Sequence, residues 1–427
     1  MKIMDKRMFL KSLAMAGAAV PLSGQAMTDW VSRFGGKSAT DLSSDEVFWT
    51  GIRKGYKLKP EYINLENGYY NFLPEELLES FIGHVREVNY QGSYYMRTVQ
   101  FENKKKMADK LAALAGCPAD ELVITRNTTE SLDLVIGGLH WQTGDEAVMA
   151  EQDYGSMLEM FKLVAKRYGV INRIVSIPNH PESDEEIVDI YAKAITSKTR
   201  LLMISHMINI TGQILPVRKI CDMAHAKGVD VMVDGAHALA HIQFKISDLN
   251  CDYYGASLHK WLSVPLGAGM LQIKKENIAK VWPLLAESER NSDDISRLNH
   301  IGTHPAHTDL TIADAIDYFQ KIGPERKEER LRYLQQYWTG KVRSMPNVEV
   351  NTPIESNRAC GIANVGIKGM KPALLADTLL KKYAIYTVAI DYANVHGCRI
   401  TPNLFTTPQD LDVLVKALTE LGNAQRT

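Results

Sequence analysis

Short apolar runs separated by helix-length segments are the feature of the middle of the chain that most restricts its fold. Seven such runs are LVIT (122–125), AVMA (147–150), INRIVSI (171–177), RLLMIS (200–205), VDVMVD (229–234), CDYYGAS (251–257) and GAGMLQI (267–273). Helical patterns fill the gaps, as at 185–195 and at 216–227, where Gly228 ends the helix. Buried strands that alternate with helices are typical of a parallel sheet covered on both faces. The pattern therefore predicts an α/β fold with a mostly parallel sheet over about residues 100–275.

The pattern changes near residue 320 to short strands mixed with helices. Strands are expected at 348–350, 361–367, 385–390 and 398–403, and helices at 324–345, 371–383 and 409–421. This mixture predicts a smaller α+β domain. We therefore expect four parts: an N-terminal signal segment (1–27), a segment that joins the small domain (28–74), a large domain (75–318) and a small C-terminal domain (319–427). A polar linker is expected around 37–46.

Composition excludes several classes of partner. The chain has 49 Lys plus Arg against 50 Asp plus Glu, so its net charge of -1 gives no electrostatic reason to expect nucleic acid. Its five cysteines lack the CxxC spacing of a zinc site, and their odd number does not indicate a disulfide framework. We expect free thiols, no metal site, and a small molecule as the partner.

The first 27 residues have the architecture of a signal peptide. Four basic residues (Lys2, Lys6, Arg7 and Lys11) precede an apolar run at 12–22 and a small-residue stretch at 23–26. Residues 5–11 resemble a twin-arginine export motif in which Lys6 replaces the first arginine. The alternative is an amphipathic helix or a disordered tail. The apolar run is shorter than the roughly 20 residues of a spanning helix. We expect a folded protein exported to the periplasm or secreted, with no membrane span in its mature form.

Polar residues gather at the predicted carboxyl ends of the strands, where open α/β sheets bind ligands. They are Thr128, Thr129, Asp234, His237, Ser257, His259 and Lys260. Taken singly, a lysine there is a surface residue, an aspartate a helix cap, and a serine or threonine part of a turn. Together they are the groups that pyridoxal 5′-phosphate (PLP) requires: a lysine amine, an acid for the ring nitrogen, and hydroxyls at a helix N-terminus for the phosphate. The sequence predicts PLP as the cofactor.

Five segments carry a resemblance to a known family. They are TRNTTES (125–131), SHMINITGQILPV (205–217), VDGAHA (233–238), DYYGASLHK (252–260) and IGTHPAH (301–307). The chain is similar to the class V, cysteine-desulfurase-like branch of fold-type I PLP enzymes, over nearly everything after the signal segment. The resemblance implies the PLP-dependent transferase fold type I and a homodimer whose active sites are shared between subunits.

The resemblance also implies a role for each residue of the site. Lys260 would form the Schiff base and carry the α-proton, Asp234 would pair with the ring nitrogen, and His237 would contact the ring oxygen. Thr128, Thr129, Ser257 and His259 would hold the phosphate, and Thr303 would reach the phosphate of the neighbouring subunit. Tyr154 would cover the ring, although Gln152 is the stricter positional match. Asn209 and Arg399 would bind the substrate carboxylate; otherwise Arg399 is a surface arginine on a strand.

One departure from the family limits the reactions that the chain is expected to catalyse. Cysteine desulfurases carry a nucleophilic cysteine on the loop before the substrate arginine, and residues 389–397 contain none. Cys398 reads as structural and Cys360 lies too early, so desulfurase activity is disfavoured.

The remaining resemblance is to the isopenicillin-N-epimerase-like subgroup, including NGYYNFLP (67–74) and SYYMR (93–97). Arg97 would meet a second substrate carboxylate or pair on the surface. We expect an enzyme acting at Cα of an amino acid or amino-acid-containing metabolite, by transamination or epimerisation, that tailors a secreted peptide or siderophore. The alternatives are a PLP-dependent lyase and a PLP-binding protein without turnover.

Overall fold

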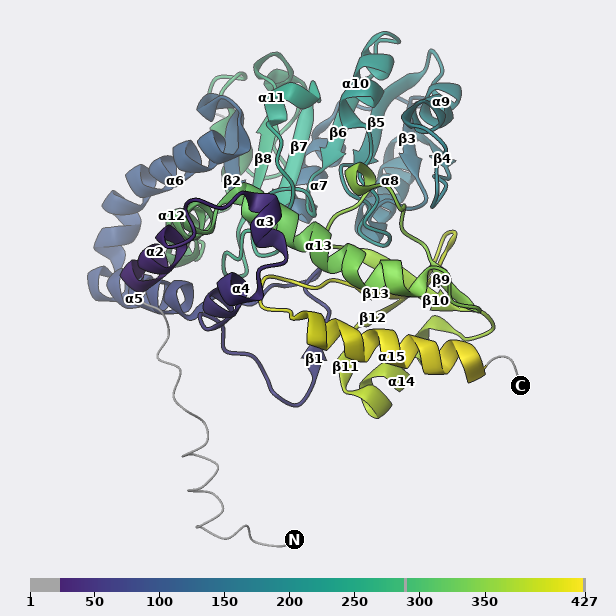
Figure 1. Cartoon of the computed structure of the whole chain (residues 1–427). Helices are drawn as coiled ribbons and strands as arrows, with labels where there is room; N and C mark the ends of the chain where they lie inside the picture. Colours follow the sequence, from purple (N-terminus) through teal and green to yellow (C-terminus); the bar gives the residue numbers. More distant parts are fainter. Residues whose placement is uncertain (1–23, 288–289, 425–427) are drawn as a thin grey trace, which may run out of the picture.

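Seven strands form the central sheet in the computed structural model, which describes residues 24–287 and 290–424 (Figure 1). Their order across the sheet is β2-β8-β7-β6-β5-β3-β4, and β8 runs in the opposite direction to the other strands. The strands are β2 (Leu122–Thr125), β3 (Glu146–Ala150), β4 (Ile171–Val175), β5 (Thr199–Ser205), β6 (Asp230–Asp234), β7 (Tyr253–Ser257) and β8 (Gly269–Ile273). Each overlaps a predicted strand, and the predicted α/β fold with a mostly parallel sheet is confirmed.

Helices cover both faces of this sheet because its strands are apolar on both sides. In β6, Val231 and Val233 pack in the core that α9 and α10 cover, whereas Met232 packs in the core under α7 and α8. The helices are α6 (Gln100–Ala115), α7 (Thr128–Gly138), α8 (Gly155–Tyr168), α9 (Asp184–Ala194) and α10 (Val217–His225). Short helical turns are η2 (Ala119–Glu121), α11 (Ile246–Leu249), η3 (Lys275–Lys280) and η4 (Ile295–Asn299).

The register of three strands brings distant polar residues to one edge of the sheet. Gly269 of β8 lies opposite both Thr125 of β2 and Ser257 of β7. A Cβ atom at Gly269 would lie 2.5 Å from the Cα of Asn127, so glycine is required for this close approach. The start of α7 therefore lies next to the end of β7.

The C-terminal part of the chain forms a second, antiparallel sheet in the order β12-β13-β10-β9. Its elements are α13 (Pro324–Val342), β9 (Val348–Val350), η5 (Ser356–Arg358), β10 (Ala363–Ile367), α14 (Pro372–Tyr383), β12 (Val388–Tyr392), β13 (Val395–Ile400) and α15 (Pro408–Ala424). Figure 1 shows α13 crossing between the two sheets.

Two predicted strands have different limits from those expected. The run 385–390 is divided, because β11 (Ile385–Tyr386) pairs with β1 (Ile63–Asn64) before β12 begins. The predicted strand at 398–403 starts earlier, in β13, and ends at Ile400. Residues 389–397 lie in a hairpin, which turns at Ala393 with a φ of 53°.

The N-terminal segment contains more helix than the sequence suggested. It forms α2 (Gly24–Ser32), α3 (Ala39–Ser43) and α4 (Glu46–Arg53). The linker expected at 37–46 is wrong, because Ser38 caps α3 and Leu42 is buried against the core. Residues 1–23 of the expected signal segment lie outside the described residues. The division into domains stays a prediction.

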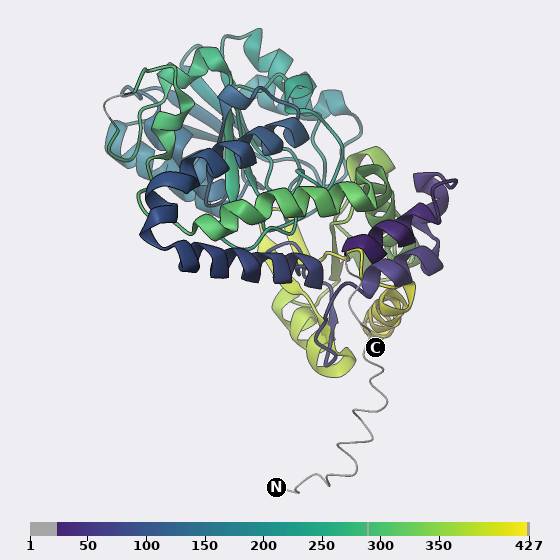
Figure 2. The same cartoon turned by 90° about the vertical axis from the view of Figure 1, so that its left-hand side faces the viewer.

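Three long helices pack together beside the large sheet (Figure 2). They are α5 (Glu75–Gln91), α6 and α12 (Ala306–Ile322), with the π-helical turn η1 (Tyr95–Val99) joining α5 to α6. Within residues 24–287 and 290–424, none of the helices has the length and hydropathy needed to cross a lipid bilayer.

Candidate active site

Lys260 lies three residues beyond the end of β7, at the edge of the sheet where the parallel strands end. Its Nζ atom is 3.1 Å from Nε2 of His237. Burial is the largest cause that lowers the pKa of Lys260, to about 8, and the nearby Asp234 carboxylate opposes this shift. A lysine with this pKa presents a substantial fraction of neutral, nucleophilic amine near neutral pH.

The protonation of His237 follows from its second partner. The Trp261 indole nitrogen lies 3.3 Å from Nδ1 of His237, and an indole N–H can only donate. Nδ1 is therefore the acceptor, and Nε2 carries the proton that points to the Lys260 amine. Burial lowers the pKa of His237 well below its ordinary value, so the ring is neutral.

Two buried carboxyl groups lie at the ends of β6 and β3, the two strands that flank β5. Asp234 ends β6, and its Oδ1 accepts the backbone N–H of Ala236 at 2.9 Å; burial raises its pKa. Asp153, which follows β3, accepts a hydrogen bond from the Ser205 hydroxyl at 2.7 Å. Burial is the main cause that raises the pKa of Asp153 to about 7, and the charge of Asp234 adds to it. The sequence analysis missed Asp153, although its position three residues after the end of a buried strand was a usable signal.

Hydroxyl groups meet at the N-terminus of α7. The Ser257 oxygen lies 2.7 Å from the Thr128 hydroxyl and accepts the Thr128 backbone N–H at 2.9 Å. Thr129 is half-buried in the first turn of the same helix. Nearby in sequence, Nδ1 of His259 is buried without a partner among the described residues, and burial lowers its pKa to about 4. Hydroxyls gathered at the N-terminus of a helix suit an anion, because the helix dipole favours negative charge there.

Arg399 in β13 is buried, but another side chain already holds its guanidinium. Its Nη2 is 2.5 Å and its Nε 3.2 Å from the two carboxylate oxygens of Glu66. Its Nη1 donates to the backbone oxygen of Asn209 at 3.2 Å. Both predicted carboxylate-binding residues thus lie together, and Glu66 is a residue that the sequence reasoning missed.

The two candidates for the residue that covers the cofactor ring differ in whether their side chains are already hydrogen-bonded. The side-chain amide of Gln152 is fully engaged: it donates to Ile177, Ser176 and Asn394, and accepts the Ile177 N–H. Tyr154 is 38% exposed at the start of α8.

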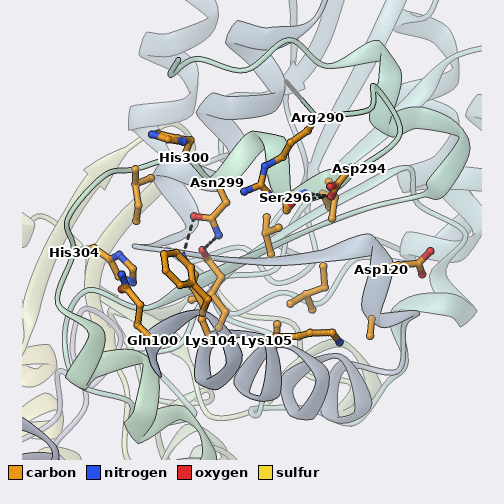
Figure 3. A pocket seen from close by; sticks show the side chains of 18 of the residues that line it. Gln100, Lys104, Lys105, Asp120, Arg290, Asp294, Ser296, Asn299, His300 and His304 are labelled. Atoms are coloured by element: carbon orange, nitrogen blue, oxygen red, sulfur yellow. Dashed lines mark hydrogen bonds between the residues drawn. The ribbon is translucent and has the colours of Figure 1, made fainter. Parts of the chain in front are cut away.

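Thr303 and Arg97 line a separate cavity of 1420 Å³. Figure 3 shows this cavity between α6, which carries Gln100 and Lys104, and the segment that carries Asn299, His300 and His304. Both Thr303 and Arg97 are exposed. The structure of one chain therefore does not bring Thr303 into the group of residues around Lys260.

Comparison with known proteins identifies the family. A family model described as Aminotransferase class-V matches residues 74–390. The chain belongs to the aminotransferase class-V family. Among proteins similar to this class-V chain, isopenicillin N epimerase of Streptomyces clavuligerus is 26% identical over 390 residues, which cover 87% of this chain and 98% of that protein.

Solved structures at lower identity agree in fold. The apo structure of cysteine desulfurase from Thermococcus onnurineus NA1 has a TM-score of 0.77 at 20% identity and covers 88% of this chain and 98% of its own. A C-DES variant with glycine covalently linked to its PLP cofactor has a TM-score of 0.76 at 20% identity, covering 85% and 97%. The predicted PLP-transferase fold is confirmed.

Family membership identifies PLP as the cofactor of this class-V chain, as the sequence predicted. The residues present fit it. The unpartnered Nδ1 of His259 and the hydroxyls at the start of α7 suit a phosphate, the buried Asp234 suits a ring N–H, and Lys260 supplies the amine. Their roles in binding the cofactor stay predictions.

Proposed function

We propose that this chain is a PLP-dependent enzyme that acts at Cα of an amino acid, or of an amino-acid residue in a larger metabolite, by aminotransferase or epimerase chemistry. The observation that carries the proposal is the Lys260 amine, whose pKa burial lowers to about 8 and which a neutral His237 contacts at 3.1 Å. Bound PLP supplies an aldehyde for the substrate amine and a ring that stores the electron pair of a broken Cα bond.

Residues of the chain would transfer the proton and hold the cofactor. Lys260, as a neutral amine in a partly buried site, takes the proton from Cα and returns it. Asp234 would accept the ring N–H of bound PLP, and the N-terminus of α7 with Ser257 and His259 would hold its phosphate. Tyr154 would cover the ring, because the amide of Gln152 is already hydrogen-bonded to Ile177 and Asn394.

The cysteines argue against desulfurase chemistry, which needs a thiolate near the substrate. Burial raises the pKa of Cys117, Cys251, Cys360 and Cys398 to about 12, and that of Cys221 also rises. The hairpin before Arg399 contains no cysteine. The proposal is therefore limited to reactions that leave no sulfur on the protein.

Location and assembly complete the proposal. Export to the periplasm or secretion is proposed from residues 1–27, and its support is the sequence alone. A tailoring role on a secreted peptide or siderophore would suit that location. A homodimer with shared active sites is proposed because Thr303 is exposed on a cavity that Lys260 does not line.

Covalent labelling tests the core of the proposal. The protein is loaded with PLP, reduced with borohydride and digested, and the modified peptide is mapped by mass spectrometry. We expect the label on Lys260 and none in Lys260→Ala. Lys104→Ala is the matched control, because burial lowers the pKa of that lysine as well, and it should label as the native chain does. Label confined to another lysine contradicts the proposal.

A second measurement separates the reactions. The holoenzyme is incubated with amino acids in deuterated water. Deuterium at Cα with inversion indicates epimerisation, and a keto acid that forms only with an amine acceptor indicates transamination. A keto acid formed without an acceptor would indicate a lyase instead, and a cofactor spectrum that no substrate changes would indicate a binding protein.

A further inference from the structure

The ion pair between Glu66 and Arg399 lies inside the candidate active site. Glu66 is 9% exposed and Arg399 is 6% exposed. The segment that carries Glu66 lies against the loop that carries Lys260, because the backbone N–H of Asn71 donates to the backbone oxygen of His259 at 3.2 Å. The charges of both residues of the pair also act on the pKa of Lys260, Arg399 lowering it and Glu66 raising it. The pair is bidentate, with two guanidinium nitrogens on two carboxylate oxygens, which is the geometry that binds carboxylates most strongly.

Several backbone contacts fix Glu66 in this position. Its Oε1 also accepts the Tyr69 backbone N–H at 2.9 Å. Glu66 forms a β-bridge with Thr401, and the next residue, Asn67, donates its backbone N–H to the Thr401 hydroxyl at 2.6 Å. The carboxylate is therefore held by its own segment as well as by Arg399.

The close packing of Gly68 on Arg399 also supports this arrangement of Glu66 and Arg399. A Cβ atom at residue 68 would lie 2.9 Å from Cζ of Arg399. The backbone after Glu66 thus packs directly against the guanidinium, and a larger residue would push the two apart.

A free α-carboxylate on the substrate meets an obstacle here. To reach the fork of Arg399 it must displace Glu66, which leaves a buried carboxylate without its cation, or it must lie beside Glu66 and be repelled. A substrate without that negative charge avoids both costs. An amide oxygen can accept from an outer N–H of Arg399, and an amide nitrogen can donate to Glu66.

We propose that Glu66 is a specificity-determining residue that occupies Arg399 and selects primary amines whose neighbouring carboxyl group is absent or amidated. The inference rests on the proposed function, because it assigns the substrate class of the same site. Free α-amino acids would be poor ligands, and an amino group next to an amide bond a good one.

The test compares alanine with alaninamide, in both enantiomers, in the native chain and in Glu66→Gln. Binding is measured by the absorbance of the bound cofactor and, without cofactor, by titration calorimetry. We expect the native chain to bind alaninamide about tenfold or more tightly than alanine, or about 1.4 kcal/mol. Glu66→Gln should tighten alanine binding about tenfold and leave alaninamide within about threefold.

The controls keep each outcome decisive. Glu146, at the start of β3, forms another bidentate pair, with Arg173 of β4, and Glu146→Gln should change the binding of neither ligand. If Glu66→Gln fails to fold, Glu66→Asp takes its place, since the shorter carboxylate withdraws from the fork. Equal binding of both ligands by the native chain, or no gain in alanine binding in the variant, overturns the inference. Labelling away from Lys260 would instead reject the proposed function, while the calorimetry still reports on Glu66.

Discussion

The Trp261 indole controls Lys260 through His237. Its N–H holds His237 in the tautomer whose Nε2–H points to the amine, and this contact favours neutral Lys260. Trp261→Phe keeps an aromatic ring against His241, on which Trp261 stacks at 3.6 Å, but removes the donor. We expect the pKa of Lys260 to rise from about 8 toward its ordinary value. At a pH below the pKa of Lys260, each unit by which this pKa rises lowers the fraction of neutral amine about tenfold.

The measurement is the rate at which the cofactor-free chain gains the absorbance of bound PLP, followed from pH 6 to pH 10. The neutral amine is the reactive form, so the rate rises with pH through the pKa of Lys260, and the midpoint should move upward in Trp261→Phe. Trp338→Phe is the control, because that buried indole N–H has no hydrogen-bond partner among the described residues. The prediction is contradicted if Trp261→Phe keeps both the native midpoint and the native ¹⁵N chemical shifts of His237, which report the tautomer of that ring.

The start of α7 and the end of β7 act together as a phosphate site. Ser257→Ala removes the hydroxyl that orders Thr128 and that is available to the phosphate. A hydrogen bond to a charged group contributes about 1.5–3 kcal/mol, so we expect PLP to bind about tenfold or more weakly. Pyridoxal, which lacks the phosphate, should bind as it does to the native chain. The dissociation constants are measured by quenching of tryptophan fluorescence.

A serine at another helix start provides the comparison. Ser183 caps α9 by accepting the Glu186 N–H, and Ser183→Ala should lower stability by about 1 kcal/mol without changing the affinity for PLP. Equal weakening of PLP and pyridoxal in Ser257→Ala would show that the hydroxyl supports the ring and not the phosphate.

Local patterns explain which elements were predictable. Strands β2, β3 and β6 contain short buried apolar runs. Asn127 marks the start of α7, because its side-chain Oδ1 accepts the Glu130 N–H and caps the helix. Glu66 carries no such signal, because its partner Arg399 is 333 positions away and the β-bridge between Glu66 and Thr401 brings them together. The division of 385–390 has the same cause, since β11 exists only through its pairing with β1. These features depend on contacts between segments that are distant in the sequence, and the hydrophobic periodicity of one segment gives no sign of such contacts.

Three aromatic side chains remain exposed on the segment that runs from the end of α5 to the start of α6. Tyr90, Tyr94 and Phe101 are 87%, 67% and 66% exposed, and Phe101 also lines the cavity that Thr303 lines. Exposed aromatic side chains are typical of a protein interface, and a second copy of the chain would cover them. We expect light scattering to give twice the mass of one chain, and Phe101→Glu to give the mass of one. Ile354→Glu, at a residue 68% exposed between β9 and η5, should leave the dimer intact.

Shared active sites make a stronger prediction, because they require residues from both copies. If Thr303 completes the partner's phosphate site, Thr303→Val should weaken PLP binding about tenfold, as expected for one lost hydrogen bond to a charged group. Lys260→Ala alone forms no covalent link to the cofactor. A hybrid dimer of the two variants contains one site with both defects and one with neither. Mixing the two variants should therefore restore borohydride labelling of Lys260 in about half of the hybrid's sites, at the PLP concentration that labels the native chain. If Thr303 instead serves its own chain, mixing should restore no labelling.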